Sequence, residues 1–259
     1  MWTPDPIAFQ IGPLAIRWYG ILLSTALALG TYLAYREAEK QKIDPEYIIN
    51  LVVVAAPLGF IGARIYYILF FNLEYYLSHP AEIPAVWHGG LAIHGALIGG
   101  IIGGYLVVRR YRLNFWQIAD IVAPSLILGQ AIGRWGNFFN QEAYGYETDL
   151  PWAMYIDGAY RHPTFLYESL WNLTVFIILI LVRRKKFIRQ GDLFAGYIAM
   201  YSLGRVFVES FRTDSLMLGP FRIAQLVSLI GIAFGLIFII YNHRKNQEPQ
   251  AQETTKRRS

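Results

Sequence analysis

The sequence contains no cysteine and unusually little charge for its 259 residues. Without cysteine there can be no disulfide, no thiolate metal site and no cysteine nucleophile, so any thiol in the chemistry belongs to a substrate. Charged residues make up 16% of the chain, whereas soluble globular proteins carry about 25%. Hydrophobic residues make up 55%. This balance is typical of an integral membrane protein.

Seven long apolar runs separate the polar connections of the chain. A helix needs about 20 mostly apolar residues to cross a bilayer core of roughly 30 Å. We therefore predict an all-α integral membrane protein, with seven transmembrane helices in one domain, residues 1–241. The expected spans are Trp18–Tyr35, Tyr47–Phe71, Gly89–Val108, Phe115–Ile132, Phe165–Val182, Leu193–Phe211 and Phe221–Tyr241.

The positions of the basic residues give these spans an expected orientation. Of the 23 lysines and arginines, 16 lie in the connections after spans one, three and five and in the C-terminal segment. Lysine and arginine are enriched in cytoplasmic loops. We therefore expect the N-terminus outside and the C-terminus in the cytoplasm, and this topology explains the net charge of +5 without a nucleic-acid partner.

Two segments outside the spans have contrasting compositions. Residues 133–164 form the longest connection and mix aromatic residues with turn pairs such as Asp157-Gly158. They predict a small ordered extracytoplasmic cap between helices four and five, with a short strand within Leu150–Ile156. Residues 242–259 are polar and charged, and we expect them to form a disordered, basic cytoplasmic tail.

The polar residues of the spans are expected to converge at the outer leaflet. Ionisable residues inside a membrane are costly and usually functional. Arg205 lies 12 residues into span six, roughly 18 Å along a helix, and Glu209 and Arg212 share its helical face. The other groups expected at this depth are Tyr19, Arg64, His94, Arg134, Asn137, Glu142 and Glu168. Several arginines in one cavity at that depth indicate a phospholipid phosphate.

Each of these groups also has a purely structural interpretation. Arg205 and Glu209 could form an ion pair that locks span six, and Arg64 could snorkel to lipid phosphates. His94 could be a packing residue after its Gly-Gly turn, and Tyr19 could belong to an interfacial aromatic belt. In span three we prefer the structural interpretation, close helix packing through glycines four residues apart: Gly95, Gly99 and Gly103.

The stretch after span four matches a family signature. Residues 133–145 read GRWGNFFNQEAYG. This run resembles the pattern G-R-x-G-N-F-x-N-x-E-x-x-G of the prolipoprotein diacylglyceryl transferases, with all eight fixed positions matched. Further similarity covers Arg17–Gly20, His88–Gly95, Arg161–Pro163, Tyr167-Glu168 and Gly204–Arg212. The resemblance therefore extends over nearly the whole chain.

This resemblance implies a specific reaction. The family transfers the diacylglyceryl group of phosphatidylglycerol to the lipobox cysteine thiol of an exported prolipoprotein, and glycerol phosphate leaves. It is the first step of bacterial lipoprotein maturation. The implied location is the bacterial cytoplasmic (inner) membrane, with the active site facing the outer leaflet. The implied partners are phosphatidylglycerol, the prolipoprotein signal peptide and the bilayer; no metal or organic cofactor is implied, and a monomer would contain every proposed group.

The resemblance also implies roles for individual residues. Arg134 and Arg205 would hold the lipid phosphate, because the guanidinium fork matches phosphate oxygens bidentately. Asn137 would add a neutral hydrogen bond, and Gly145 would shape the loop. His94 and Tyr19 would line the same cavity as catalytic groups. Glu142 is expected at the lipid head group with Asn137 and Gly145, and Glu142 and Glu209 would orient the arginines or balance their charge. The residues expected to support this site are Glu168, Glu209, Arg212 and Arg64.

The identity of the general base stays open at this point. A free thiol titrates near pH 8.5, so only about a few per cent is thiolate at neutral pH. His94 is the leading candidate, because histidine has an unperturbed pKa of about 6.5. Alternatively, the cationic site lowers the thiol pKa and His94 donates to the phosphate. Two other classes of protein would also explain the arginines, an anion transporter and a non-catalytic phospholipid-binding protein.

Overall fold

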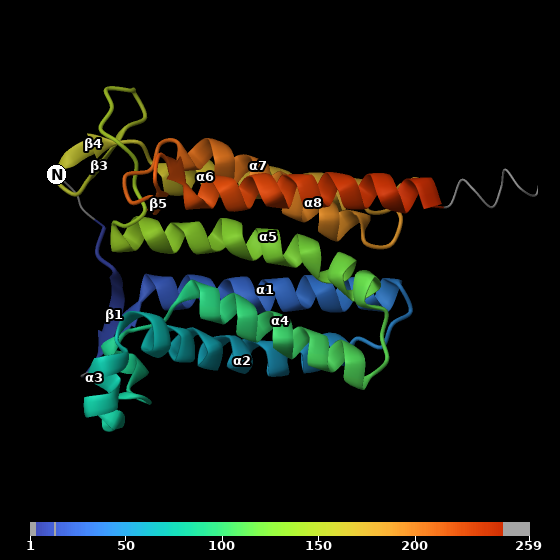
Figure 1. Cartoon of the computed structure of the whole chain (residues 1–259), viewed down its shortest axis with the longest axis horizontal. Helices are drawn as coiled ribbons and strands as arrows, with labels where there is room; N and C mark the ends of the chain where they lie inside the picture. The colour runs from blue at the N-terminus through green and yellow to red at the C-terminus, as the bar shows by residue number, and fades with distance from the viewer. Residues whose placement is uncertain (1–3, 13, 246–259) are drawn as a thin grey trace, which may run out of the picture. The chain divides into compact units, whose positions relative to one another are not determined.

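The computed structural model describes residues 4–12 and 14–245, which are mostly helical (Figure 1). The chain forms two compact units. The central unit is Leu33–Ile118, and the terminal unit combines the residues before and after it. The predicted disorder of residues 246–259 lies outside the described residues.

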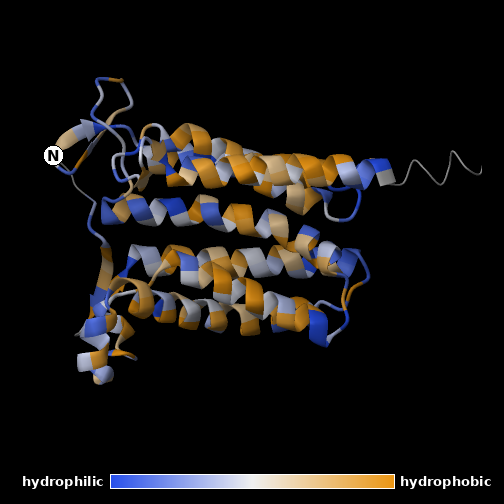
Figure 2. Ribbon diagram, in the orientation of Figure 1, coloured by the Kyte–Doolittle hydropathy of each residue, from blue (hydrophilic) through white to orange (hydrophobic). Residues whose placement is uncertain are grey.

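Each predicted apolar run corresponds to a long helix. The helices are α1 (Trp18–Lys40), α2 (Glu46–Phe71), α4 (Ile93–Arg110), α5 (Phe115–Asn140), α6 (Thr164–Val182), α7 (Asp192–Glu209) and α8 (Ile223–Lys245). Within the described ranges, four helices are long and apolar enough to cross a membrane, namely α2, α5, α6 and α8. Apolar residues run along the long helices in Figure 2, whereas polar residues gather near their ends. The helical membrane architecture is supported, and the count of seven spans and their orientation stay predictions.

Short elements occupy the connections. Three antiparallel hairpins pair β1 (Ile7–Ile11) with β2 (Leu14–Arg17), β3 (Met154–Ile156) with β4 (Ala159–Arg161), and β5 (Met217–Leu218) with β6 (Phe221–Arg222). Between α2 and α4 lie helix α3 (Leu73–Ser78) and the 3-10 turns Pro80–Glu82 and Val86–His88. The hairpins β1–β2 and β5–β6 were not predicted.

The strand predicted within the cap is confirmed only at its end. The prediction covered Leu150–Ile156, and β3 begins at Met154. The turn predicted at Asp157-Gly158 is confirmed. Its two residues have φ values of 50° and 82°, the left-handed conformation that a two-residue hairpin turn requires.

Helix α5 corrects the predicted boundary between span four and the cap. The apolar run ends at Ile132, but the helix continues through Asn140. Aromatic packing supports this extension, because the rings of Trp135 and Phe138 lie 5.6 and 5.0 Å from the ring of Phe165 on α6. Residues 133–140 are therefore helical, and the irregular cap begins at Gln141.

Other predicted boundaries also differ: helix α1 continues through Lys40 rather than ending at Tyr35, and two further differences have local reasons. Helix α4 begins at Ile93 rather than Gly89, because Gly89 and Gly90 have φ values of 89° and 80°, outside the helical region. Helix α8 continues through Lys245 rather than ending at Tyr241. A hydrogen bond of 2.8 Å from Asn242 to Asp192 stabilises this extra turn. The predicted tail therefore does not begin at residue 242.

In the terminal unit, α7 packs between α6 and α8. The buried residues of α6 recur with helical spacing and form one stripe facing its neighbours: Phe165, Glu168, Ser169, Asn172, Val175 and Leu179. The later part of the stripe joins an apolar core with Ile127 and Leu193. The earlier part is polar, and this half carries the candidate site.

In the central unit, α2 packs against α4 through glycines. A side-chain carbon added at Gly95 or Gly99 would collide with backbone atoms of α2, and one added at Gly103 would lie 2.7 Å from the Ala55 Cα atom. The predicted role of these glycines in close helix packing is confirmed. The unit therefore depends on backbone proximity rather than on large interlocking side chains.

Candidate functional site

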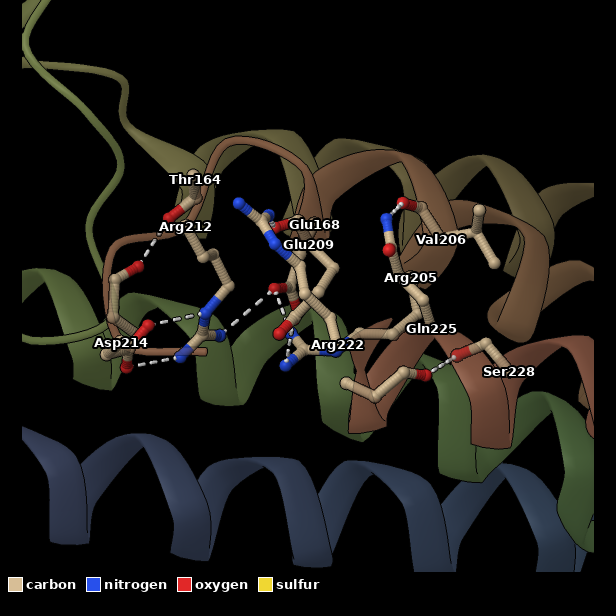
Figure 3. A network of polar contacts seen from close by, with 12 residues as sticks. Thr164, Glu168, Arg205, Val206, Glu209, Arg212, Asp214, Arg222, Gln225 and Ser228 are labelled. Atoms are coloured by element: carbon tan, nitrogen blue, oxygen red, sulfur yellow. Dashed lines mark hydrogen bonds and ion pairs between the residues drawn. The ribbon is translucent and has the colours of Figure 1, made fainter. Parts of the chain in front are cut away.

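Glu168 is the buried centre of a partly buried arginine cluster in the terminal unit (Figure 3). Its carboxylate lies on α6 and is 4% exposed. Arg205 Nη1 lies 2.6 Å from Glu168 Oε1, and Arg212 Nη1 lies 3.4 Å from the same oxygen. Arg134 Nη2 lies 2.5 Å from Oε2, as an ion pair without the angle of a directed hydrogen bond. One carboxylate thus gathers cations from α5, α7 and the loop after α7.

A second buried carboxylate orients Arg205. Glu209 follows one helical turn later on α7, and its Oε2 atom lies 2.7 Å from Arg205 Nη2. Glu209 is 2% exposed. Because Arg205 is held from both sides by Glu168 and Glu209, its guanidinium plane is fixed before any ligand arrives.

Asp214 holds Arg212 in a bidentate pair. Arg212 Nε donates to Oδ1 at 2.9 Å and Nη2 donates to Oδ2 at 2.6 Å. Burial alone would raise the pKa of Asp214, but the hydrogen bond and charge of Arg212 outweigh it and hold that pKa below its usual range. Burial alone would lower the pKa of Arg212, and the bond and charge of Asp214 outweigh it and raise that pKa. Both groups are therefore charged at neutral pH.

Arg222 belongs to the same network, although the sequence analysis assigned it no role. Its Nη1 atom donates to the backbone carbonyl of Glu209, and Nη2 donates to the Tyr146 hydroxyl at 3.1 Å. A basic residue at the predicted outer end of the last span was the available signal. The network contains four arginines (Arg134, Arg205, Arg212 and Arg222) and three carboxylates (Glu168, Glu209 and Asp214).

Hydrogen bonds connect the signature residues Glu142, Asn137 and Arg134 in series. Arg134 Nη1 donates to Asn137 Oδ1 at 3.4 Å, and Asn137 Nδ2 donates to Glu142 Oε1 at 2.9 Å. The backbone amide of Glu142 also donates to the Asn137 carbonyl at 3.0 Å. Glu142 therefore fixes the orientation of the Asn137 amide and acts on Arg134 through it.

Tyr19 lies against the same turn of α5. A side-chain carbon added at Gly136 would collide with the Tyr19 ring, and the neighbouring Trp18 ring stacks on Phe139 with centroids 5.0 Å apart. The beginning of α1 thus packs beside the stretch that carries Arg134. The absence of a side chain at Gly136 makes this approach possible.

Gly145 lies where the cap meets the residues after α7. A side-chain carbon there would lie 2.8 Å from the Phe211 carbonyl oxygen and 2.7 Å from the His162 Cβ atom. Gly145 and Arg212 form an antiparallel bridge, and the Tyr146 amide donates to the Phe211 carbonyl at 2.9 Å. Only glycine allows this backbone approach, which places Arg212 next to Glu168.

Arg64 and His94 belong to the central unit, whereas the arginine cluster belongs to the terminal unit. The His94 ring lies in the first turn of α4, with its centroid 5.6 Å from that of Tyr66. Arg64 is 6% exposed and donates to backbone carbonyls. The alternative that Arg64 snorkels to lipid is wrong, because the side chain is buried. The expected convergence of both residues with the arginine cluster stays a prediction.

These observations define a class, a mostly helical membrane protein with a partly buried arginine cluster near helix ends. The family model for prolipoprotein diacylglyceryl transferase matches residues 6–241. The phosphatidylglycerol–prolipoprotein diacylglyceryl transferase of Listeria monocytogenes serotype 4b (strain CLIP80459) is 48% identical over 261 residues, covering 96% of this chain and 94% of the relative. The Bacillus mycoides (strain KBAB4) protein of that name is 49% identical over 255 residues, covering 94% of each.

The chain belongs to the prolipoprotein diacylglyceryl transferase family. The resemblance predicted from the signature is confirmed, and with it the interpretation of the chain as a membrane-bound transferase. Membership in this family favours an enzyme over the two alternatives considered, an anion transporter and a non-catalytic lipid-binding protein.

Proposed function

We propose that this chain transfers the diacylglyceryl group of phosphatidylglycerol to the lipobox cysteine thiol of a prolipoprotein. The reaction would take place at the outer leaflet of the bacterial cytoplasmic membrane, with the N-terminus outside, seven spans and a monomer as the working unit. The observation that supports the proposal most strongly is the partly buried group of Arg134, Arg205 and Arg212 around the buried carboxylate of Glu168. Such a group suits an anionic lipid head, because guanidinium stays charged in a low dielectric.

Arg134 and Arg205 would hold the phosphate of the lipid. Among the described residues, their ion pairs and hydrogen bonds engage the Nη atoms, which leaves each Nε–H group as a donor. The phosphate gains a second negative charge as the glycerol carbon–oxygen bond breaks. Donors that are already fixed stabilise this developing charge more than they stabilise the ground state.

Glu168 and Glu209 would keep the arginines together before the lipid arrives. Three guanidinium groups would otherwise repel one another in a poorly solvated site. Arg212 and Asp214 would complete this scaffold, and Glu142 would align Arg134 through Asn137. Asn137 would also offer its amide to the phosphate, and Gly145 would maintain the backbone approach that places Arg212.

The chemical step would be a substitution at carbon. The sulfur electron pair forms the new carbon–sulfur bond, and the electrons of the carbon–oxygen bond leave with the phosphate oxygen of glycerol phosphate. The thiol proton passes to a base. His94 is our choice for this base, and Tyr19 would be a second catalytic group. The alternative role of His94 is to donate to the phosphate while the cationic site lowers the thiol pKa.

The proposed reaction is tested with purified protein, phosphatidylglycerol and a short lipobox peptide. We expect glycerol phosphate and a peptide heavier by one diacylglyceryl group, and neither product from a peptide with serine in place of cysteine. His94→Ala and Arg134→Ala should abolish both products while the protein remains folded. Folded wild-type protein that is inactive with this lipid and with other anionic phospholipids would contradict the proposal, and anion flux in liposomes would be measured next.

A further inference from the structure

Arg64 on α2 has every one of its donors engaged. A guanidinium group has five N–H donors, and Arg64 makes five hydrogen bonds to main-chain carbonyl oxygens of one connection. The acceptors are Glu82 at 2.6 Å, Ile83 at 2.9 Å, Ala85 at 3.4 Å, Gly89 at 2.6 Å and Gly90 at 3.0 Å. Arg64 therefore has no donor left for a phosphate unless it releases this connection.

The charge of Arg64 is balanced without a carboxylate in the part of the chain that the structure describes. Its guanidinium carbon lies 4.9 Å from the centre of the buried Tyr76 ring, a cation–π contact. The nearby carboxylate of Glu82 instead pairs with His88 Nδ1 at 2.7 Å. Carbonyl dipoles and one aromatic face thus replace the ion pairs that surround the other buried arginines.

The connection that Arg64 holds leads directly into His94. Gly89 and Gly90, whose carbonyls it binds, precede the start of α4 at Ile93. The preceding residue on α2 adds another contact, because the Ala63 carbonyl accepts from the Ala92 amide at 3.1 Å. Two consecutive residues of α2 therefore fix the backbone immediately before the helix turn that carries His94.

We propose that Arg64 is a positioning residue for His94 and that it does not bind the lipid phosphate. By fixing the path of residues 82–92, it sets the first turn of α4 and hence the direction of the His94 ring. This inference rests on the proposed function only for the catalytic role of His94. The position of His94 itself can be measured without activity.

The kinetic test compares Arg64→Lys with Arg109→Lys, an exposed arginine at the other end of α4. Lysine keeps the charge but offers three donors from one atom, too few to hold five carbonyls. We expect Arg64→Lys to lower kcat by about 10- to 100-fold, the cost of slight misplacement of a catalytic group, with KM for phosphatidylglycerol little changed. Arg109→Lys should behave like wild type. A raised KM with unchanged kcat would show that Arg64 binds lipid, and would overturn the proposal.

A second variant tests the same contact while leaving the arginine in place. In Gly90→Ala, the new methyl group would lie 2.5 Å from Arg64 Nη1 and 2.7 Å from the Tyr67 ring. Gly89→Ala is its matched control, because Gly89 has a similar positive φ and no neighbour within 4 Å of the added carbon. Both substitutions strain the backbone, but only Gly90→Ala adds a clash with Arg64. We therefore expect the larger loss of kcat from Gly90→Ala. Equal losses would contradict the proposed contact.

A spectroscopic measurement separates this inference from the proposed function. Protein labelled on its five histidines gives ring signals, and the His94 signal is the one lost in His94→Gln. We expect that signal to broaden or double in Arg64→Lys and Gly90→Ala and to stay single in Arg109→Lys. An unchanged His94 signal would overturn the positioning role even if kcat fell. Full activity of His94→Gln would instead overturn the catalytic role of His94, while a disturbed signal would still support the positioning role.

Discussion

The arginines of the two units lie in contrasting environments, partly buried in the terminal unit and fully buried in the central unit. In the terminal unit, Arg134, Arg205 and Arg212 share the carboxylate of Glu168 and retain partly exposed side chains, 21%, 18% and 11% of their areas. In the central unit, Arg64 is surrounded by carbonyl oxygens and an aromatic ring. In the terminal unit, carboxylates balance the charges of the arginines. In the central unit, the dipoles of backbone carbonyls surround the single charge of Arg64.

This difference distinguishes an anion-binding site from a structural contact. A carboxylate that gathers arginines can be joined or replaced by another anion, because phosphate and carboxylate make the same bidentate interaction with guanidinium. Carbonyls that saturate an arginine cannot be replaced without unfolding the connection that supplies them. Burial of an arginine therefore does not by itself indicate phosphate binding; the kind of acceptor around it decides.

The largest expected effect comes from removing a cluster arginine. Arg134→Ala should lower the rate of diacylglyceryl transfer by about 10³-fold, because a fixed donor to a developing negative charge contributes that much. Release of glycerol phosphate measures it. Arg109→Ala, at an exposed position, is the control. Activity within twofold of wild type in Arg134→Ala would place the chemistry elsewhere.

Neutralising the central carboxylate should weaken the fold. Glu168→Gln keeps the shape but leaves three arginines without their shared partner, at a cost of about 3–5 kcal/mol for a buried pair that is broken on one side. Thermal unfolding in detergent measures this cost. Added inorganic phosphate should restore more stability in Glu168→Gln than it adds to wild type. If phosphate stabilises both proteins equally, the anion does not bind beside Glu168.

The close backbone approach at Gly145 gives the next prediction. Gly145→Ala should displace Arg212 from Glu168 and lower activity by about 100-fold, as small displacements at a catalytic site do. Gly133→Ala, within the same signature, adds a carbon with no neighbour within 4 Å and should retain most activity. Equal losses in the two variants would show that the loss in Gly145→Ala does not come from displacement of Arg212.

The smallest expected effect concerns pH. The pKa of Asp214 lies below its usual range, so its pair with Arg212 stabilises the fold above the unfolded value of about 3.9 and loses this effect as the pH falls through the lower folded value. The Asp214 side chain is 50% exposed, so Asp214→Asn should cost only about 0.5 kcal/mol after solvent screening. Unfolding measured at neutral pH and in acid, below the lowered pKa of Asp214, should show the cost at neutral pH alone. A cost that persists in acid would come from packing instead.

The helical framework could be predicted because apolar length is a property of each segment alone. The boundaries that failed depend on tertiary contacts. The extension of α5 to Asn140 rests on aromatic packing with α6, and the extra turn of α8 rests on the bond from Asn242 to Asp192. Neither contact can be read from local composition.

The candidate site was predictable in its residue types and less so in its connections. Helical spacing placed Arg205, Glu209 and Arg212 on one face, and the signature singled out Arg134. The central position of Glu168 could not be predicted, because it depends on how α5, α6 and α7 pack. The carbonyl contacts of Arg64 were equally hidden, since they come from the main chain of another segment.

Binding of short-chain phosphatidylglycerol, followed by phosphorus NMR, tests the central claim most directly. We predict saturable binding to wild type and to Arg109→Gln, and affinity lowered by at least about tenfold, the loss of one charge-assisted contact, in Arg134→Gln and Arg205→Gln. Equal affinity in all four folded proteins would show that the arginines around Glu168 do not hold the lipid phosphate.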